Sequence, residues 1–507
     1  MLTGITHRLP VALAIAMLLA SSMATASGTR LGAATAAIAE LHPGMSGVLL
    51  LDTGAEALTA RDALIADAER TIDAQYYIWN ADASGRYLAA RLLAAADRGV
   101  HVRVLLDDIN VAGRDAVLAD LAVHKNVEVR IYNPTAARSG ALRVLGFVSD
   151  FSRLNRRMHN KSFTVDGVVT IIGGRNIGDE YFDLNPQRNF RDRELLVAGP
   201  VVGEVRAGFE AFWQSAWTKS VAALSPGRSG FGGESTSQAL LESATSEVAA
   251  LGYTPPPEPE VLILTRSLPA LRWAPARLTF DPPPTAEQIA DSDQQQPVAL
   301  ALRQLVASAR EEILVESAYF ILGDDSLAET ARLHAAGVRL KTLTNSLASN
   351  DLVTNHSGYA RRRSAMLDAG IELYELRPDA AACQKLVRTS RACEGAAGFS
   401  LHSKSLVVDR RVVYVGSFNV NLRSTYLNSE IALIVESPEL AAQVAESINE
   451  LQRPDNSWQV VRADDGGLEW RTERNGALVR EWHEPMTSAW RRFQSRLLRL
   501  FPLEKYL

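Results

Sequence analysis

Cysteine is the scarcest residue of this 507-residue chain, which contains only Cys383 and Cys393. Two cysteines without further matching ligands do not form the usual four-ligand zinc site, so a structural metal is not expected. In an oxidising compartment the two thiols would close a short loop as a disulfide, while a pair of buried free thiols is the alternative. No cysteine lies near the N-terminus to carry a lipoprotein anchor.

An excess of basic residues is also missing, since the formal net charge is −5. Nucleic-acid binders usually carry a basic footprint, so we expect no nucleic-acid partner. Beyond the N-terminus, no apolar stretch is long enough to cross a bilayer. The content of 47% hydrophobic and 22% charged residues is that of an ordinary globular protein, which excludes a disordered or fibrous chain.

The N-terminus has the pattern of a secretory signal peptide. His7 and Arg8 precede an apolar run at 11–20, and Ala24-Thr25-Ala26 provides a small-residue cleavage site. We expect residues 1–26 to be removed, which places the protein in the periplasm or at the periplasmic face of the inner membrane. An uncleaved N-terminal anchor is the alternative.

The length of the chain exceeds the usual limit for one hydrophobic core, so two domains are expected. Alternating strand and helix patterns recur in both halves, which predicts an α/β fold. We assign residues 27–224 to the first half, the Gly-, Ser- and Pro-rich residues 225–260 to a linker, and 261–507 to the second half. Each half is predicted to be an α/β/α unit with a mixed, largely parallel sheet, and a pseudo-twofold axis to relate the two.

One sequence motif occurs twice, at 157–176 and again at 400–419. Both copies place Lys two residues after His, Asp five residues after Lys, and Asn ten residues after Asp. On a strand, residues two apart point to the same side, so each half presents an imidazole beside an ammonium group. The matched residues are His159, Lys161, Asp166 and Asn176 in the first copy, and His402, Lys404, Asp409 and Asn419 in the second.

Brought face to face, the two copies would surround one tetrahedral anion. Such a site suits phosphodiester transfer without a metal or other cofactor: one neutral imidazole attacks phosphorus, and the other, protonated, donates to the leaving oxygen. Lysine and asparagine would stabilise charge on the non-bridging oxygens. A catalytic imidazole also needs a carboxylate on its other nitrogen, and Glu194 and Glu430 are the candidates.

The paired motifs resemble the H-x-K-x(4)-D-x(6)-G-[SG]-x-N motifs of the phospholipase D superfamily. That resemblance implies a catalytic set of His, Lys and Asp from each copy, with His159 as nucleophile and His402 as general acid and base. It also implies a phosphate site made by Asn176, Ser417 and Asn419. The first copy departs from the second at Gly174, which stands where the second has Ser417. Asp166 and Asp409 lie at strand-to-turn junctions, where a structural role is expected.

Further stretches narrow the likeness to bacterial cardiolipin synthases of the C type: QYYIW, GGRNIGDEYF, the run TNSLASNDLVTNHSGYARRR and the terminal FPLEKYL. This implies phospholipid substrates, with a phosphatidyl group transferred to phosphatidylglycerol. A hydrolase that uses water as acceptor, on phospholipid or less plausibly on nucleic acid, is the alternative. A non-catalytic lipid-binding protein is a third class, which the intact motifs disfavour.

Two segments mix large apolar residues with arginine, at 142–157 and 488–507. In the second, Trp490, Phe493, Leu497, Leu500 and Phe501 fall on one helical face and arginines on the other. Both segments fit a membrane surface, and both also fit helices docked on the protein core. Near the predicted strand ends, Tyr76, Tyr77 and Tyr319 could line the substrate cleft together with His356, but ordinary packing or a loop hydrogen bond is the expected role, and none is assigned to catalysis.

Overall fold

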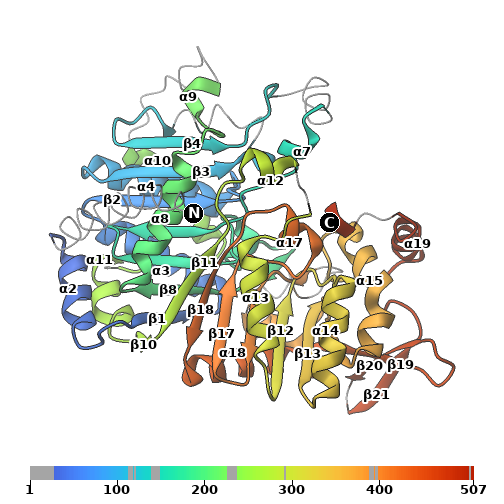
Figure 1. Cartoon of the computed structure of the whole chain (residues 1–507). Helices are drawn as coiled ribbons and strands as arrows, with labels where there is room; N and C mark the ends of the chain where they lie inside the picture. Colours follow the sequence, from blue (N-terminus) through green and yellow to red (C-terminus); the bar gives the residue numbers. More distant parts are fainter. Residues whose placement is uncertain are drawn as a thin grey trace, which may run out of the picture.

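The computed structural model describes residues 28–111, 118, 121–138, 149–224, 237–257, 259–290, 293–386, 393, 398–474, 476–501 and 504–506 (Figure 1). The predicted signal peptide and residues 142–148 of the first basic apolar segment lie outside these ranges.

The first half is built on a nine-stranded sheet in the order β10-β1-β8-β6-β5-β2-β3-β4-β9. Helices α3 (Gly54–Asp67), α4 (Ala83–Asp97), α8 (Val201–Trp213) and α10 (Ser237–Ala250) belong to this half. Its strands are β1 (Ser46–Leu51), β2 (Thr71–Tyr76), β3 (His101–Asp107), β4 (Val127–Tyr132), β5 (Ser162–Val165), β6 (Val169–Gly173), β8 (Glu194–Ala198), β9 (Thr218–Ser220) and β10 (Arg272–Ala274).

The second half repeats this order in a ten-stranded sheet, β11-β18-β17-β16-β12-β13-β14-β19-β20-β21. Its helices include α13 (Pro297–Ala307), α14 (Asp324–Ala335), α15 (Val353–Asp368), α17 (Leu422–Tyr426), α18 (Pro438–Leu451) and α19 (Ala489–Leu498). Its strands are β11 (Ala276–Phe280), β12 (Glu312–Ser317), β13 (Arg339–Asn345), β14 (Ile371–Leu376), β16 (Lys404–Val408), β17 (Val412–Gly416), β18 (Ile431–Glu436), β19 (Ser457–Arg462), β20 (Leu468–Arg474) and β21 (Ala477–Glu481).

The two α/β halves with mixed sheets confirm the predicted fold class, but the prediction of largely parallel sheets is wrong. Among the described strands of the two large sheets, only β2-β3-β4 and β12-β13-β14 run parallel. Each repeated motif folds as an antiparallel hairpin, β5-β6 or β16-β17, and inserts beside the parallel strands. A parallel pairing needs a long crossover, whereas these motif strands are joined by tight turns.

The two motif turns also explain the aspartates. Asp166 and Gly167 have φ of 50° and 68°, and Asp409 and Arg410 both have φ of 49°. These left-handed residues match the tight hairpin turn that suits twisted strands. The carboxylate of Asp166 accepts the backbone N–H groups of residues 69–71, and that of Asp409 accepts those of residues 310–312. Both aspartates therefore fix the entry to β2 or β12, at the strand ends remote from the histidines. These contacts agree with the structural role expected from the turns, and the catalytic role that the resemblance implied for Asp166 and Asp409 is wrong.

The boundary between the halves lies later than predicted. Strand β10 pairs with β1, and Ile263, Leu268 and Leu271 are buried in the core of the first half. Part of the predicted linker is helix α10, which packs on α4 and buries Ala244 and Val248. Residues up to Ala274 thus belong to the first half, because short apolar runs within a Pro-rich stretch still bury their side chains. Residues 225–236 of the predicted linker lie outside the described ranges.

The halves share a buried core of their own. Residues of β6, β8 and α8 pack with residues of β16, β17, β18 and α18 in one apolar cluster, which includes Ile172, Val197, Val415 and Leu433. A small parallel sheet of β7 (Asn189–Arg191) and β15 (Phe399–Leu401) also joins them. These contacts fix the relative position of the two motifs.

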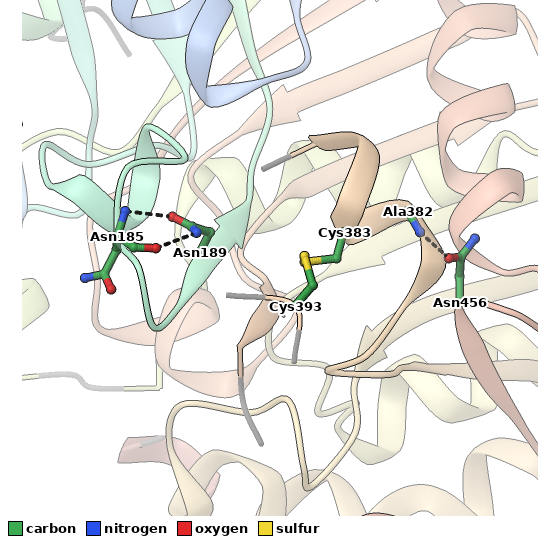
Figure 2. Close-up of a disulfide and its surroundings, with 6 residues drawn as sticks. All are labelled: Asn185, Asn189, Ala382, Cys383, Cys393 and Asn456. Atoms are coloured by element: carbon green, nitrogen blue, oxygen red, sulfur yellow. Dashed lines mark hydrogen bonds between the residues drawn. A yellow bond between two sulfur atoms is a disulfide. The ribbon is translucent and has the colours of Figure 1, made fainter. Parts of the chain in front are cut away.

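Cys383 and Cys393 form a disulfide in the segment that leads to the second motif (Figure 2). The bond lies in a small apolar cluster with Phe399 and Leu401 of β15, the strand just before His402. The backbone N–H of Ala382 donates to the side chain of Asn456, 2.8 Å away, which ties the other side of the bond to the chain after α18. The disulfide alternative of the sequence prediction is the one found.

Candidate active site

Each motif histidine is held by the opposite half of the molecule. The backbone N–H of His159 donates to the carbonyl of Ser429 at 2.8 Å, and its Nδ1 lies 2.7 Å from Oε2 of Glu430. The second half of the site mirrors this arrangement. The backbone N–H of His402 donates to the carbonyl of Arg191 at 2.7 Å, and its Nδ1 lies 2.5 Å from Oδ2 of Asp192.

The contact of Glu430 with an imidazole agrees with the sequence prediction, but the prediction for Glu194 is wrong. The carboxylate of Glu194 is buried between the guanidinium groups of Arg61 and Arg175, at 2.5 Å and 3.2 Å. Asp192 takes the position that corresponds to Glu430. The prediction aligned Glu194 with Glu430, and that alignment of the two halves is shifted by two residues. Aligning the apolar runs 195–197 and 433–435 instead pairs Asp192 with Glu430.

Ser417 lies beneath Glu430 rather than in the phosphate site predicted for it. Its hydroxyl donates to Oε2 of Glu430 at 2.5 Å and accepts the N–H of Ile431 at 2.9 Å. Ser424 donates to the other carboxylate oxygen at 2.7 Å. A hydroxyl has a single proton to donate, so Ser417 orients the carboxylate that orients His159.

The difference between the two motifs at Gly174 follows from the same geometry. A Cβ atom at Gly174 would lie 2.5 Å from Oδ1 of Asp192 and 3.2 Å from Cδ of Lys404. The shorter aspartate needs this space to reach His402. Each copy therefore orients its imidazole with a matched pair of residues. Gly174 leaves room for Asp192 beside His402, and Ser417 orients Glu430 beside His159.

Both motif lysines are buried beside the imidazoles. Nζ of Lys161 donates to the carbonyl of His159 at 2.7 Å, while Nζ of Lys404 donates to the carbonyl of His402 and lies 3.0 Å from its Nδ1. Burial lowers the pKa of Lys404 to about 8 against the attraction of Asp192, and it lowers the pKa of Lys161 well below its usual range. Burial removes water from both ammonium groups. An anion bound between them would restore the favourable interactions that they lost with that water.

The two motif asparagines differ in their bonding. Oδ1 of Asn176 accepts the N–H of Ile78 at 3.2 Å, and its amide donates to the hydroxyl of Tyr181 at 3.1 Å. Asn419 is also buried, and its Oδ1 has no hydrogen-bond partner among the residues that the structure describes. Asn176 is thus bonded on both its polar atoms within the protein, whereas Asn419 is not.

Burial keeps both imidazoles neutral at physiological pH. It lowers the pKa of His159 to about 4, with Glu430 opposing the shift and Lys161 reinforcing it. Burial and the charge of Lys404 together lower the pKa of His402 to about 4, with Asp192 opposing. Burial alone would raise the pKa of the Asp192 carboxyl, but His402 and Lys404 lower it to about 2. The site therefore combines neutral imidazoles with ionised carboxylates.

Aromatic rings cover both histidines. The ring of Tyr77 meets that of His159 edge to face at 4.8 Å between centroids, and Nζ of Lys161 lies 5.3 Å from the Tyr77 centroid. The ring of Tyr181 meets that of His402 in the same manner at 5.2 Å. Packing was the favoured expectation for Tyr77, and its contact with His159 supports the alternative that it lines the cleft.

The other three residues set aside earlier lie in different surroundings. The hydroxyl of Tyr76 is bonded by Arg61, and His356 is buried 3.1 Å from Arg363. The hydroxyl of Tyr319 donates to the carboxylate of Asp351 at 2.9 Å. Tyr76 and His356 therefore stabilise the interior, in agreement with the expectation.

Two α/β halves that meet around a pair of carboxylate-bound imidazoles and buried lysines define a phospholipase D-type protein. The family model described as the PLD-like domain of cardiolipin synthase matches residues 62–213 and again residues 302–452. The chain therefore belongs to the cardiolipin synthase branch of the phospholipase D superfamily.

Individual relatives agree with this membership. The chain is 40% identical to cardiolipin synthase C of Escherichia coli (strain K12) over 94% of this chain and 99% of that one. It is 31% identical to an uncharacterized protein of Helicobacter pylori (strain ATCC 700392 / 26695) over 91% of this chain and 89% of the other. The crystal structure of phosphatidylserine synthase from Haemophilus influenzae Rd KW20 shares the fold, with a TM-score of 0.58 at 13% identity, over 93% of this chain and 100% of the other.

Proposed function

We propose that this enzyme transfers a phosphatidyl group from a donor phospholipid to phosphatidylglycerol through a covalent phospho-histidine. One observation carries the proposal: two neutral imidazoles, each bound at Nδ1 by a carboxylate from the opposite half. With the Nδ1 proton donated to a carboxylate, each Nε2 keeps a free lone pair. A pair of such nitrogens beside two ammonium groups suits a two-step exchange at one phosphodiester.

In the first step, Nε2 of His159 attacks phosphorus, and the bond from phosphorus to the leaving oxygen breaks. His402, protonated at Nε2, gives that oxygen its proton. In the second step, a hydroxyl of phosphatidylglycerol attacks phosphorus, His402 takes its proton, and the bond to His159 breaks. An anionic phosphodiester between the two lysines stabilises the protonated form of His402 that the first step requires. The choice of His159 as nucleophile follows the superfamily pattern.

Product analysis tests this function. Purified, chelator-treated protein is mixed with vesicles that contain phosphatidylglycerol and a second phospholipid, and cardiolipin is the expected product. Phosphatidic acid as the sole product would instead identify a hydrolase. For the nucleophile, His159→Ala should abolish covalent labelling by a donor with radiolabelled phosphorus, while His402→Ala should retain some label. Undiminished labelling of the His159 variant would refute the assignment.

We also propose that helix α19 binds the membrane surface. Its apolar side chains face outward, since Trp490, Phe493 and Leu497 are 64%, 52% and 46% exposed. Arg491 instead turns toward the protein and donates to the carbonyls of Leu347 and Asn350. An exposed row of aromatic and aliphatic residues rimmed by arginine is typical of an interfacial helix. No helix among the described residues is both long and apolar enough to span a bilayer.

Two variants distinguish membrane binding by this surface from nonspecific binding by any exposed apolar residue. The double variant Trp490→Ser and Phe493→Ser should lose most of its binding to anionic vesicles in a flotation assay. Leu478→Ser, which changes an equally exposed apolar residue on β21, is the matched control and should bind as the unchanged protein does. Equal binding by all three proteins would contradict the proposal.

We propose, finally, that the protein is exported and acts in the periplasm or at the periplasmic face of the inner membrane. The predicted leader and the disulfide between Cys383 and Cys393 support this, because disulfides persist in oxidising compartments. N-terminal sequencing of the protein recovered from the periplasmic or membrane fraction should start at Ser27. Recovery in the cytoplasm with a free thiol pair would contradict export.

A further inference from the structure

A cavity of about 430 Å³ lies between the second sheet and helices α13 and α14. Figure 1 shows these two helices running along that sheet. The volume falls within the range of about 300–1,000 Å³ that is usual for ligand pockets.

Apolar side chains form much of the cavity wall. The sheet contributes Val315, Leu340 and Leu406, and α13 contributes Leu302 and Val306. Charged residues also line the cavity, including the buried Lys404 and the ion pair of Arg362 with Asp324, whose side chain is 83% exposed. A mostly apolar pocket with a few charged groups suits a ligand that joins an apolar chain to an anionic group.

The cavity reaches the catalytic centre, because Lys404, which contacts His402, is part of its lining. The fully buried Ile313 lines it as well. Lys404 lies opposite Ser317, and Ile313 lies four residues earlier on the same strand. At about 3.3 Å per residue, the lining therefore spans about 13 Å along β12.

The rim of the cavity also adjoins the C-terminal segment of the chain. Tyr426 of α17 lines the cavity, and Nζ of Lys505 lies 5.4 Å from the centroid of its ring. The next residue, Tyr506, is 45% exposed and packs edge to face on Phe151. The rim thus lies where exposed aromatic residues of both halves meet.

We propose that one fatty acyl chain of a phospholipid substrate enters this cavity while its phosphate lies between His159 and His402. The inference rests on the proposed function for the identity of the lipid, but the cavity itself is a separate binding site. A diacyl phospholipid joins an anionic phosphate to long apolar chains through a short glycerol. The lysine site and the mostly apolar cavity beside it match that combination of charge and apolar chain.

Photo-crosslinking tests occupancy without any turnover. The unmodified protein is incubated with vesicles that contain phosphatidylglycerol with a diazirine at the terminal acyl carbon, irradiated and digested. We expect crosslinked peptides from α13 and from β12 or β13. Crosslinks confined to α19, or absent altogether, would overturn the proposal.

A chain-length series tests the consequence for catalysis. With phosphatidylglycerols short enough to stay monomeric, each added methylene that enters the cavity should raise kcat/KM about fourfold. Ala299→Phe fills the cavity from α13 and should flatten this dependence, whereas Ala301→Phe, equally buried on the same helix but outside the cavity, should preserve it. Equal slopes in all three proteins would overturn the proposal.

The two experiments also separate this proposal from the proposed transfer reaction. If no cardiolipin forms with any substrate, the transferase function fails, yet crosslinks within the cavity still establish an acyl site. If cardiolipin forms but no crosslink reaches the cavity, the function holds and the acyl site is refuted.

Discussion

Replacing Asp192 with Asn tests the crossed arrangement of the active site most directly. The carboxylate lies 2.5 Å from Nδ1 of His402 and is fully buried, so it is poised to stabilise the imidazolium that forms when His402 takes a proton. Two opposite charges whose centres are about 4 Å apart attract each other by about 4 kcal/mol at the effective dielectric constant of about 20 that suits proteins. Loss of that attraction corresponds to a rate decrease on the order of 10³.

The assay is steady-state cardiolipin formation together with chemical quench of the covalent intermediate. Asp192→Asn should lower kcat about a thousandfold, because both steps require His402 to carry a proton. The thermal midpoint should also fall, because His402 and Lys404 stabilise the ionised Asp192 in the folded state, so kcat is compared per folded molecule.

Glu194→Gln is the matched control, two residues along the chain. It breaks a buried pair with Arg61 and should cost about 3–5 kcal/mol of stability, while kcat per folded molecule stays near that of the unchanged protein. The reasoning is refuted if Asp192→Asn keeps its kcat, or if Glu194→Gln loses as much activity per folded molecule.

Three further predictions concern the surroundings of the site. Both imidazoles have a folded-state pKa of about 4, below the unfolded value of about 6.5, so the unfolded chain binds more protons between these values. In urea unfolding, the stability that the two histidines contribute should be fully present above about pH 6.5 and should be lost as the pH falls toward about 4. Ser417→Ala removes a hydrogen bond to the Glu430 carboxylate and should lower kcat about tenfold, whereas Gly174→Ser should lower it further by displacing Asp192; equal activity of both variants would contradict the matched-pair explanation. Replacing both cysteines by Ser opens a loop with a sequence separation of 10 and should cost about 3 kcal/mol in denaturant unfolding, and an unchanged midpoint would contradict it.

Much of the fold was predictable because its strongest signals are local. The repeated motif fixed the number of halves, and the Asp166-Gly167 turn predicted the hairpin that the structure contains. The direction of the sheets was not predictable in the same way. Alternating helices and strands favour parallel pairing, but the motif hairpins enter each sheet from a distant part of the chain. The sequence of such a hairpin does not show which distant strand it pairs with.

The site was predicted to the extent that it repeats. His159, Lys161, His402 and Lys404 converge as their spacing required, and Glu430 reaches His159. Asp192 was missed because it occupies the position that corresponds to Glu430, although its residue type differs. The prediction compared residue types, whereas the alignment of the strands decides which residues correspond. Tyr77 was named for the cleft but ranked below packing, because an aromatic residue at a strand end is most often part of a core.

The crossed contacts of the histidines also govern when the enzyme becomes active during its synthesis. His159 depends on a carboxylate that lies 271 residues later in the chain, so a ribosome-bound or half-folded molecule carries no oriented nucleophile. A truncated product would likewise be chemically silent toward membrane lipids. Both halves must therefore be synthesised and folded before either histidine is oriented by its carboxylate.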